Sequence, residues 1–238
     1  MNYYFITGSS KGLGKAIAEL LLQNSNNIIY GLSRSNNIIH DNFIYIDIDL
    51  SDIEKISKYI FPQITNANKI SLINNAGVIG EIKTVGNKNA LKISETFNIN
   101  SISPNLLMNQ FINQFQDLPI EKSIINISSG AGRHPINSWA EYCASKAALD
   151  MFSSVIAQEQ ISKENPFFTF SVAPGIIDTE MQNEIRLSTH NDFDKLDYFK
   201  DLKKNNLLSS AKEIASKISK ILENPTQFKN TLLDVRDF

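Results

Sequence analysis

The sequence has few of the features that mark secreted or membrane proteins. Its 238 residues include a single cysteine, Cys143, which excludes a disulfide within the chain and fits a reducing compartment. No uninterrupted apolar run reaches the ~18 residues of a membrane span. The first residues, MNYYFITG, lack the basic region, long apolar stretch and cleavage site of a signal peptide. We therefore expect a cytoplasmic protein that does not enter a membrane.

A large excess of charge of one sign is also missing. With 23 Lys and Arg against 25 Asp and Glu, the formal net charge of −2 gives no electrostatic reason to expect a nucleic-acid partner. The three histidines show no metal-ligand spacing with cysteines or acids, so no metal site is expected. The chain does have an ordinary globular share of 42% hydrophobic residues and a length that one α/β domain can fill. A single domain over residues 1–238 is the expectation.

Short apolar runs alternate with segments of helical periodicity along this chain. The runs are apolar at successive positions, which indicates strands buried on both faces of a sheet. Their alternation with helices predicts parallel β-α-β units with right-handed crossovers. The expected strands are 3–8, 27–33, 42–49, 70–77, 122–129, 166–175 and 230–235. The predicted fold is α/β, a Rossmann-like, doubly wound parallel sheet of about seven strands with helices on both faces.

The helical segments carry their own boundary signals. Ser51 and Glu54 have capping-box spacing at the start of a helix expected over 50–64. A long helical stretch, 88–116, is expected to break near Pro104. Residues 178–206 carry many charges with scattered apolar positions, which suits a substrate lid with one apolar face, although a solvated helical hairpin would show the same pattern.

The first strand runs into TGSSKGLGKAIA, in which Gly8, Gly12 and Gly14 precede a helix. A diphosphate must come close to the main chain at such a loop, where a Cβ would obstruct it. The free N–H groups at the start of the helix attract the anion. Because the loop lies between the first strand and the first helix, it has the context that a dinucleotide site requires.

The stretch YCASK places Tyr142 one helical turn before Lys146, and Ser129 ends the fifth expected strand. Ligands bind at the carboxyl ends of strands in open α/β sheets, so the three side chains are expected to converge there. Reduction of a ketone needs a hydride at carbon and a proton at oxygen. Tyr142 can donate that proton if the Lys146 ammonium lowers its pKa from ~10, while Ser129 hydrogen-bonds the carbonyl oxygen.

Acidic side chains are missing where the second strand ends, at Ser33 and Arg34. An acid at that place would bind the ribose hydroxyls of NAD and repel a 2′-phosphate. Arg34 offers a permanently charged fork suited to phosphate, and Lys11 in the glycine loop adds a second positive charge. The pattern favours NADPH, although both cations could instead be solvated surface residues.

The motifs TGSSKGLG, NNAG, NIN, INISS, YCASK and APG together resemble the short-chain dehydrogenase/reductase family over nearly the whole chain. The resemblance implies that Asn100 joins Ser129, Tyr142 and Lys146 in a catalytic tetrad and supports a water-mediated proton path to the lysine. It also implies that Asp49 meets the adenine, although Asp47 is close and Asp49 could simply cap a helix. Motifs and resemblance together give these cofactor contacts: Gly8, Ser10, Lys11, Gly12, Leu13, Gly14, Ser33, Arg34, Asp49, Leu50, Asn75, Ala76, Gly77, Tyr142, Lys146, Pro174, Gly175, Ile177 and Thr179.

Within this family, the Tyr–Lys helix and the segment after Gly175 resemble the benzil reductase and sepiapterin reductase group, with Ser138 where that pattern has glycine. This implies an NADPH-dependent carbonyl reductase acting on an apolar or aromatic (di)carbonyl small molecule. The alternatives are a 3-oxoacyl-thioester reductase and a non-catalytic NADP-binding regulator. The expected substrate contacts are Ser129, Trp139, Met181 and Asp234, although Trp139 could be a core or helix-start residue and Asp234 a surface charge.

The helix 142–160 carries apolar residues around more of its circumference than one core stripe requires. We expect one face to pack on the sheet and another on a second subunit. Together with the resemblance, this predicts a homodimer or homotetramer.

Overall fold

A computed structural model describes all residues, 1–238. Its strands are β1 (Asn2–Thr7), β2 (Asn27–Ser33), β3 (Phe43–Asp47), β4 (Lys69–Asn74), β5 (Glu121–Ile127), β6 (Phe167–Ala173) and β7 (Leu232–Asp234). Its helices are α1 (Gly12–Leu21), α2 (Ile53–Ser57), α3 (Ala90–Phe97), α4 (Ser103–Phe115), α5 (Ala140–Gln160), α6 (Glu180–Arg186), α7 (Leu196–Lys204) and α8 (Ala211–Glu223). Short turns of other helix types are η1 (Asn98–Ile102), η2 (Gly130–Gly132), η3 (Pro225–Gln227) and η4 (Val235–Asp237).

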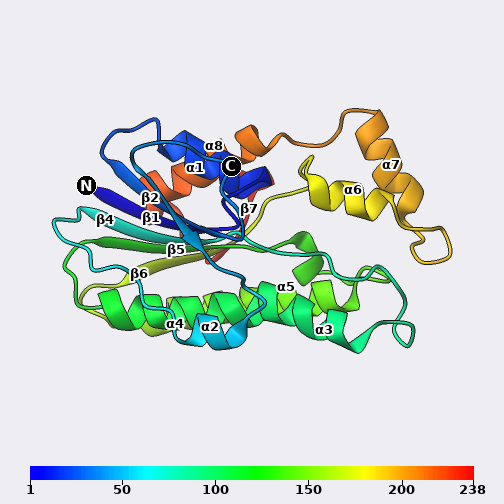
Figure 1. The fold of residues 1–238 in the computed structure, drawn as a ribbon, viewed down its shortest axis with the longest axis horizontal. Coiled ribbons are helices and arrows are strands. Elements are labelled where there is room, and N and C mark those ends of the chain that lie inside the picture. The colour runs from blue at the N-terminus through cyan, green and yellow to red at the C-terminus, as the bar shows by residue number, and fades with distance from the viewer.

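The seven strands form one parallel sheet in the order β3-β2-β1-β4-β5-β6-β7, which confirms the predicted fold class. Helices α1 and α8 cover one face, and α2, α4 and α5 cover the other (Figure 1). The strand order reverses between β1 and β4. In doubly wound sheets a ligand binds at the carboxyl ends of the strands beside such a switch point.

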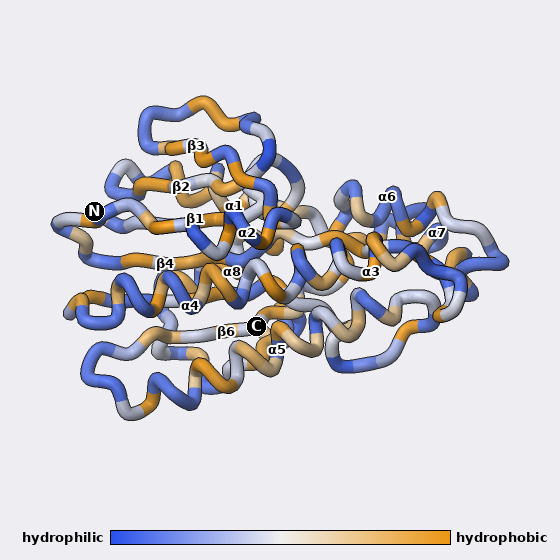
Figure 2. The backbone as a smooth tube through the Cα atoms, turned by 60° about the horizontal axis from the view of Figure 1, so that its bottom comes forward, coloured by the Kyte–Doolittle hydropathy of each residue, from blue (hydrophilic) through white to orange (hydrophobic).

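The core lies on both sides of this sheet because successive strand residues point to opposite faces. Phe5 packs into the cluster beneath α4 and α5, and its neighbour Ile6 packs into the cluster beneath α1 and α8. Both side chains are fully buried, and each such burial contributes roughly 1.5–3 kcal/mol. The strands therefore appear as apolar bands through the middle of the molecule in Figure 2.

The prediction of a helix over 50–64 that begins at Ser51 is wrong in both the length of the helix and its cap. Helix α2 covers only Ile53–Ser57, and the Asp52 side chain caps it by accepting a hydrogen bond from the Lys55 amide at 3.0 Å. The chain leaves the helix after Ser57, and Phe61 is then buried against Phe111 of α4 with ring centroids 5.0 Å apart. Burial of Phe61 in the core takes precedence over continuation of the helix.

The expected break near Pro104 has the form of the π-helical turn η1, between α3 and α4. Proline has no N–H to donate, so it favours the first turn of a new helix, and Pro104 stands at the start of α4. Such π-turns occur often at functional sites. This one carries Asn100 and directs its side chain toward α5.

Residues 178–206 form a helical hairpin of α6 and α7 beyond the carboxyl ends of the strands (Figure 1). An isolated bridge between Ile177 and Ser209 joins the two ends of this hairpin. Its inner face buries Ile185, Leu196, Phe199 and Leu202 against the start of α5. No helix of the molecule is long and apolar enough to cross a bilayer.

Candidate active site

The glycine loop between β1 and α1 has the shape that close approach of an anion requires. Gly8 and Gly12 have φ values of +67° and +57°, a region that favours glycine. A Cβ on Gly14 would lie 2.4 Å from both the Gly8 carbonyl oxygen and Asn75 Nδ2, so only glycine fits there. Lys11, the cap residue of α1, makes no side-chain hydrogen bond to the first turn. The uncapped N–H groups of α1 are therefore available to a diphosphate, and the loop fits a dinucleotide.

Thr7 begins the TGSSKGLG motif but was not among the predicted cofactor contacts, and it holds this loop against the NNAG segment. Its hydroxyl oxygen accepts hydrogen bonds of 3.0 Å from the amides of Asn75 and Ala76. The Asn75 side chain donates in turn to the carbonyl of Thr7 at 3.0 Å and of Gly8 at 3.3 Å. Asn74 donates across the sheet to Asn126 at 2.8 Å. The asparagines of this motif therefore tie strands and loop together.

The end of β2, where a 2′-phosphate was expected, presents one cation and one inward-facing hydroxyl. Arg34 is exposed, whereas Ser33 is buried and donates to the carbonyl of Ser35 at 2.8 Å. Lys11 is also exposed and forms a 3.1 Å ion pair with Glu180 at the start of α6. Ser33, Arg34 and Lys11 were expected at the phosphate. Of these, only the Arg34 side chain forms no hydrogen bond or ion pair within the chain.

Asp49 lies just beyond β3, on the turn that leads into α2. Its Oδ1 accepts hydrogen bonds from the Ser51 amide at 2.9 Å and the Ser51 hydroxyl at 2.8 Å, and these bonds with the nearby Arg34 lower the pKa of Asp49. The carbonyl of the buried Leu50 accepts a 2.6 Å hydrogen bond from Ser103. Asp49 therefore stabilises a local turn and does not cap the helix, since Asp52 is the cap of α2. Its second carboxylate oxygen is left without a partner in the chain.

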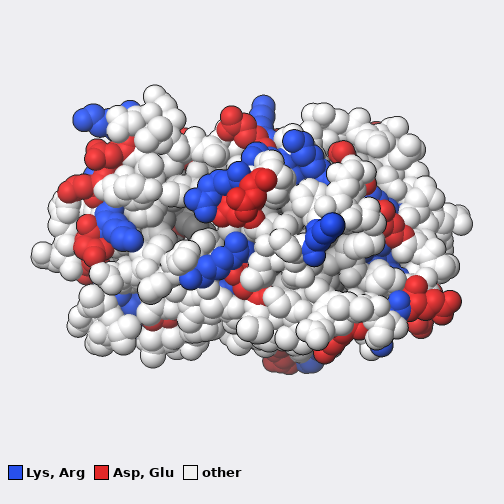
Figure 3. All heavy atoms as spheres, turned by 180° about the vertical axis from the view of Figure 1, so that it is seen from behind, with Lys and Arg blue, Asp and Glu red and all other residues white.

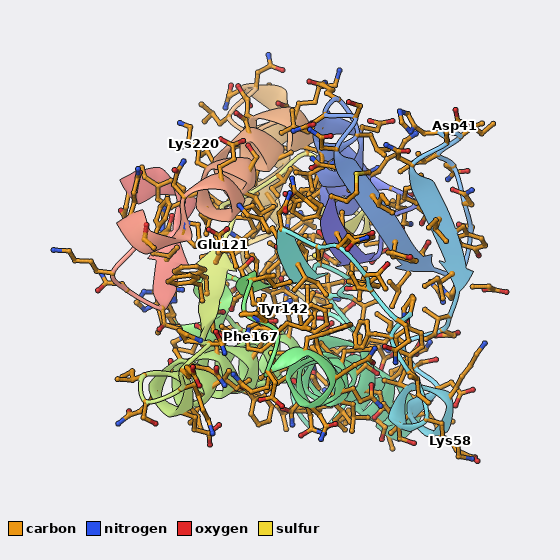
Figure 4. All side chains as sticks on the ribbon, turned by 90° about the vertical axis from the view of Figure 1, so that its left-hand side faces the viewer. Asp41, Lys58, Glu121, Tyr142, Phe167 and Lys220 are labelled. Atoms are coloured by element: carbon orange, nitrogen blue, oxygen red, sulfur yellow. The ribbon has the colours of Figure 1, made fainter.

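The structure brings Tyr142, Lys146 and Ser129 together at the carboxyl end of β5. Tyr142 and Lys146 are buried on one face of α5, with 7% and 3% of their surfaces exposed. The Lys146 ammonium lies 5.9 Å from the centre of the Tyr142 ring. Ser129 caps η2 by accepting a 3.1 Å hydrogen bond from the Ala131 amide, and its hydroxyl is close enough to the Tyr142 phenol to lower the pKa of that phenol. Viewed along the strands, Tyr142 lies near the centre of the molecule, whereas Asp41 and Lys58 lie at the periphery (Figure 4).

The predicted acidification of Tyr142 by Lys146 is wrong for this structure. Burial raises the pKa of the phenol, and the nearby Ser129 hydroxyl opposes that shift without outweighing it. Lys146 is not among the groups that act on the phenol, and burial lowers its own pKa to about 8 against the opposing effect of Asp150. Desolvation penalises the charged form of each group, and in both it outweighs the effects that oppose it.

Asn100 lies on the π-turn η1, close to Lys146. The side chain is fully buried, accepts from the Val78 amide at 2.9 Å and donates to the Val78 carbonyl at 2.8 Å. It also donates to the Ser145 hydroxyl at 3.1 Å, a contact that no sequence motif indicated. A Cβ on Gly77 would stand 3.3 Å from both the Asn100 oxygen and the Lys146 nitrogen. Glycine at this position therefore lets the asparagine, the lysine and the main chain meet.

The segment after β6 closes the site against the glycine loop. Pro174 and Gly175 follow the strand directly, and Gly175 has a φ of +72°. Ile177 is buried at the bridge to Ser209. The methyl group of Thr179 lies 3.5 Å from the place of a Cβ on Gly12, so the two halves of the expected cofactor site lie close together.

Of the expected substrate residues, Trp139 packs on Tyr142, Met181 packs against the cluster that contains Tyr142, and Asp234 does not have a free side chain. Trp139 is buried, precedes the first residue of α5 and packs edge-on against Tyr142 with centroids 5.7 Å apart. Met181 of α6 packs on the same apolar cluster. Asp234, at the end of β7, has both carboxylate oxygens paired with the Arg236 guanidinium at 2.8 and 2.6 Å, and this pairing lowers its pKa. A substrate would have to compete with Arg236 for the Asp234 carboxylate.

Charges of both signs are interspersed on the face opposite to that of Figure 1 (Figure 3). That distribution agrees with the nearly balanced composition. No cluster of three or more His, Cys, Asp or Glu side chains in the molecule could hold a metal ion.

A family profile described as short chain dehydrogenase matches residues 2–190. The chain therefore belongs to the short-chain dehydrogenase family, and it is an oxidoreductase. This confirms the family that the motifs indicated.

Named relatives place the chain within one part of that family. It is 36% identical over 235 residues to a benzil reductase ((S)-benzoin forming) of Bacillus cereus, covering 94% of each chain. It is 26% identical to sepiapterin reductase of Bos taurus, covering 92% of this chain and 88% of the other. A crystal structure of a short chain dehydrogenase/reductase from Saccharomyces cerevisiae superposes with a TM-score of 0.85 at 26% identity, covering 99% of this chain and 96% of that one. The expected resemblance to benzil and sepiapterin reductases is confirmed.

Proposed function

We propose that this protein is an NADPH-dependent carbonyl reductase that reduces one carbonyl of an apolar or aromatic 1,2-diketone. The observation that carries the proposal is the meeting of Ser129, Tyr142 and Lys146 at the carboxyl end of β5, beside the glycine loop. The named relative from Bacillus cereus supports benzil as a representative substrate.

The chain's own groups suit the protonation half of such a reduction. Bound nicotinamide would supply the hydride to the carbonyl carbon. Tyr142, whose pKa is raised by burial, keeps its proton at neutral pH and can donate it to the carbonyl oxygen. Ser129 can donate a hydrogen bond to the same oxygen as negative charge develops there. A phenol of raised pKa favours reduction, because the reverse oxidation needs phenolate.

Lys146 and Asn100 complete the proposed machinery from behind the phenol. The lysine ammonium is held by the carbonyl of Ile127 at 2.7 Å, close to the amide of Asn100. In this position Lys146 can hold the cofactor ribose and pass a proton toward Tyr142. Asn100 then acts as a positioning residue that keeps the π-turn η1 against α5.

The preference for NADPH rests on charge at the adenosine end of the site. Arg34 follows β2 without an acidic neighbour, and Asn37, three residues later, donates a hydrogen bond to the carbonyl of Ser10, next to Lys11 in the glycine loop. A 2′-phosphate offers both cations a charge-assisted partner, whereas NAD offers only hydroxyls. The 2′-phosphate would draw Lys11 from its exposed ion pair with Glu180, which costs little.

We propose a homo-oligomer formed through the outer face of the α4–α5 layer. Met151 and Val155 of α5 leave 64% and 47% of their surfaces exposed, and Ile102 of η1, in the same layer, leaves 41% exposed. A second copy of the chain would remove these apolar surfaces from water.

A substrate and cofactor panel tests the proposed function. Consumption of NADPH and of NADH is followed with benzil, sepiapterin and an acetoacetyl thioester. The proposal predicts fast turnover of benzil with NADPH. Preference for the thioester would support a 3-oxoacyl reductase instead, and cofactor binding without any turnover would support a regulator.

A further inference from the structure

An aromatic ring of the hairpin is stacked on the wall of the proposed substrate site. Phe193, between α6 and α7, lies parallel to the Trp139 indole with ring centroids 5.3 Å apart and planes at 17°. Trp139 in turn packs edge-on against Tyr142. Phe193 is fully buried, and its ring lies in the same apolar cluster as the reacting phenol.

A substrate that reaches Tyr142 must compete with side chains already packed there. The phenol belongs to a buried apolar cluster with Trp139, Phe193 and Phe199, and only 7% of Tyr142 is exposed. Phe199 meets Trp139 at a tilted 46°, whereas Phe193 is nearly parallel to it. Phe193 therefore has the geometry that a flat aryl group would adopt on the same indole.

The segment that carries Phe193 makes few hydrogen bonds to the rest of the molecule. The backbone N–H groups of Leu187, Ser188, Asp192 and Phe193 donate only to residues 183–189. The side-chain bond from Asn137 to Asp194, at 2.7 Å, is exposed to solvent. Few anchoring bonds give a segment a low cost of local opening.

Space for the displaced ring lies directly outside. Residues 190–194 border a surface groove of about 630 Å³ together with Pro135–Ser138 and the outer side of α5. Phe193 is part of this border on one side and of the Trp139 stack on the other. A rotation outward would move its ring from the cluster into the groove without unfolding α6 or α7.

We propose that Phe193 occupies the place of an aryl ring of the substrate, and that substrate binding replaces it on Trp139 while Phe193 swings toward the groove. This rests on the proposed function. It makes Phe193 a specificity-determining residue, because an aryl ketone has to displace the ring from Trp139, whereas a small aliphatic ketone binds beside it without displacing it. The Trp139 indole N–H is buried without an acceptor, and a second carbonyl on the substrate would supply one.

Phe193→Ala and Phe193→Trp test the exchange through the ratio of kcat/KM for benzil to that for diacetyl, the dimethyl 1,2-diketone. Removal of the competing ring should raise the ratio about threefold to tenfold, the range of one aromatic stacking contribution. The larger ring should lower it. Leu187→Ala, an exposed change in the same segment, should leave the ratio as in the wild type. A ratio that falls in Phe193→Ala would make Phe193 a fixed wall of the site, and an unchanged ratio would remove it from substrate selection.

A second measurement needs no turnover, so it separates this proposal from the proposed function. Trp139 is the only tryptophan, and its emission reports directly on the stack. Phe193→Ala should increase quenching of that emission by acrylamide, and benzoin should restore protection. If acrylamide quenches Trp139 of the Phe193→Ala variant equally with and without benzoin, an aryl group does not take the place of the Phe193 ring. That result would overturn the exchange even for an enzyme that reduces benzil, whereas restored protection supports it even if benzil is not turned over.

Discussion

The Lys146 ammonium donates a hydrogen bond of 2.7 Å to the carbonyl of Ile127, the last residue of β5. The bond joins the middle of the proposed catalytic helix to the strand end that leads into Ser129. Because the lysine and the strand end are both buried, the rigid core sets the spacing between Ser129 and Tyr142. Positioning by helices and strands in this way is more exact than positioning by loops.

The charge of Lys146 should limit reduction at alkaline pH. Burial lowers the pKa of Lys146 to about 8, so the ammonium is present below that pH and is lost as the pH rises through it. We expect kcat/KM for benzil to decline above pH about 8, as measured by a pH series with NADPH. Lys146→Arg keeps a charge that does not titrate there and should flatten the profile, even at lower activity. The same decline in the arginine variant would assign it to another group.

The direction in which the pKa of Tyr142 is shifted could not be predicted from the sequence. The spacing of Tyr142 and Lys146 shows that they share a helix face, and the structure agrees. The pKa depends on how far burial outweighs nearby charge, and burial comes from the hairpin packed over the phenol. No local pattern gives that balance.

Arg34→Ala should weaken NADPH binding far more than NADH binding. Loss of a hydrogen-bonded charge at a 2′-phosphate costs about tenfold to a hundredfold in affinity, while NADH has no phosphate to lose. Dissociation constants from cofactor fluorescence measure both. Lys58→Ala, which removes an exposed cation on the flank of α2, is the matched control and should change neither. Equal losses for both cofactors in Arg34→Ala would refute this account of cofactor choice.

Gly14→Ala should lower the melting temperature although alanine favours helices. Its Cβ would lie 2.4 Å from the Gly8 carbonyl oxygen, so the loop must shift. Overpacking of this kind costs roughly 1–3 kcal/mol, or about 3–10 °C in a chain of this size. Gly130→Ala is the matched control, since its Cβ would meet no atom within 4 Å. Equal melting of the two variants by circular dichroism would show that the loop yields freely.

Strand positions followed from the sequence because their runs are apolar toward both helix layers. Strand β2 matches its predicted range at both ends. The contacts that were missed join residues far apart in the chain, such as Thr7 with Ala76 and Asn100 with Ser145. Helix α2 was misjudged because its end is set by burial of Phe61 in the core, which a capping pattern does not report.

Met151→Glu should dissociate the proposed oligomer. The residue is 64% exposed on the outer face of α5, so a charge there hardly destabilises the separate subunit. In an apolar interface the same charge would be buried, which strongly destabilises the oligomer. Light scattering after size-exclusion chromatography should show oligomers for the wild type and monomers for the variant. Ile161→Glu, at the 82% exposed end of the same helix, should stay oligomeric. A monomeric wild type would contradict the interface altogether.

The most direct test of the account is Tyr142→Phe, which removes the phenol oxygen and keeps the ring packed on Trp139. Turnover of benzil and binding of NADPH are measured on the same preparation. Loss of general-acid catalysis predicts a fall in kcat of about a hundredfold to ten-thousandfold, with NADPH affinity and melting temperature close to those of the wild type. A variant that reduces benzil within a few-fold of the wild-type rate would contradict the central claim that this phenol delivers the proton.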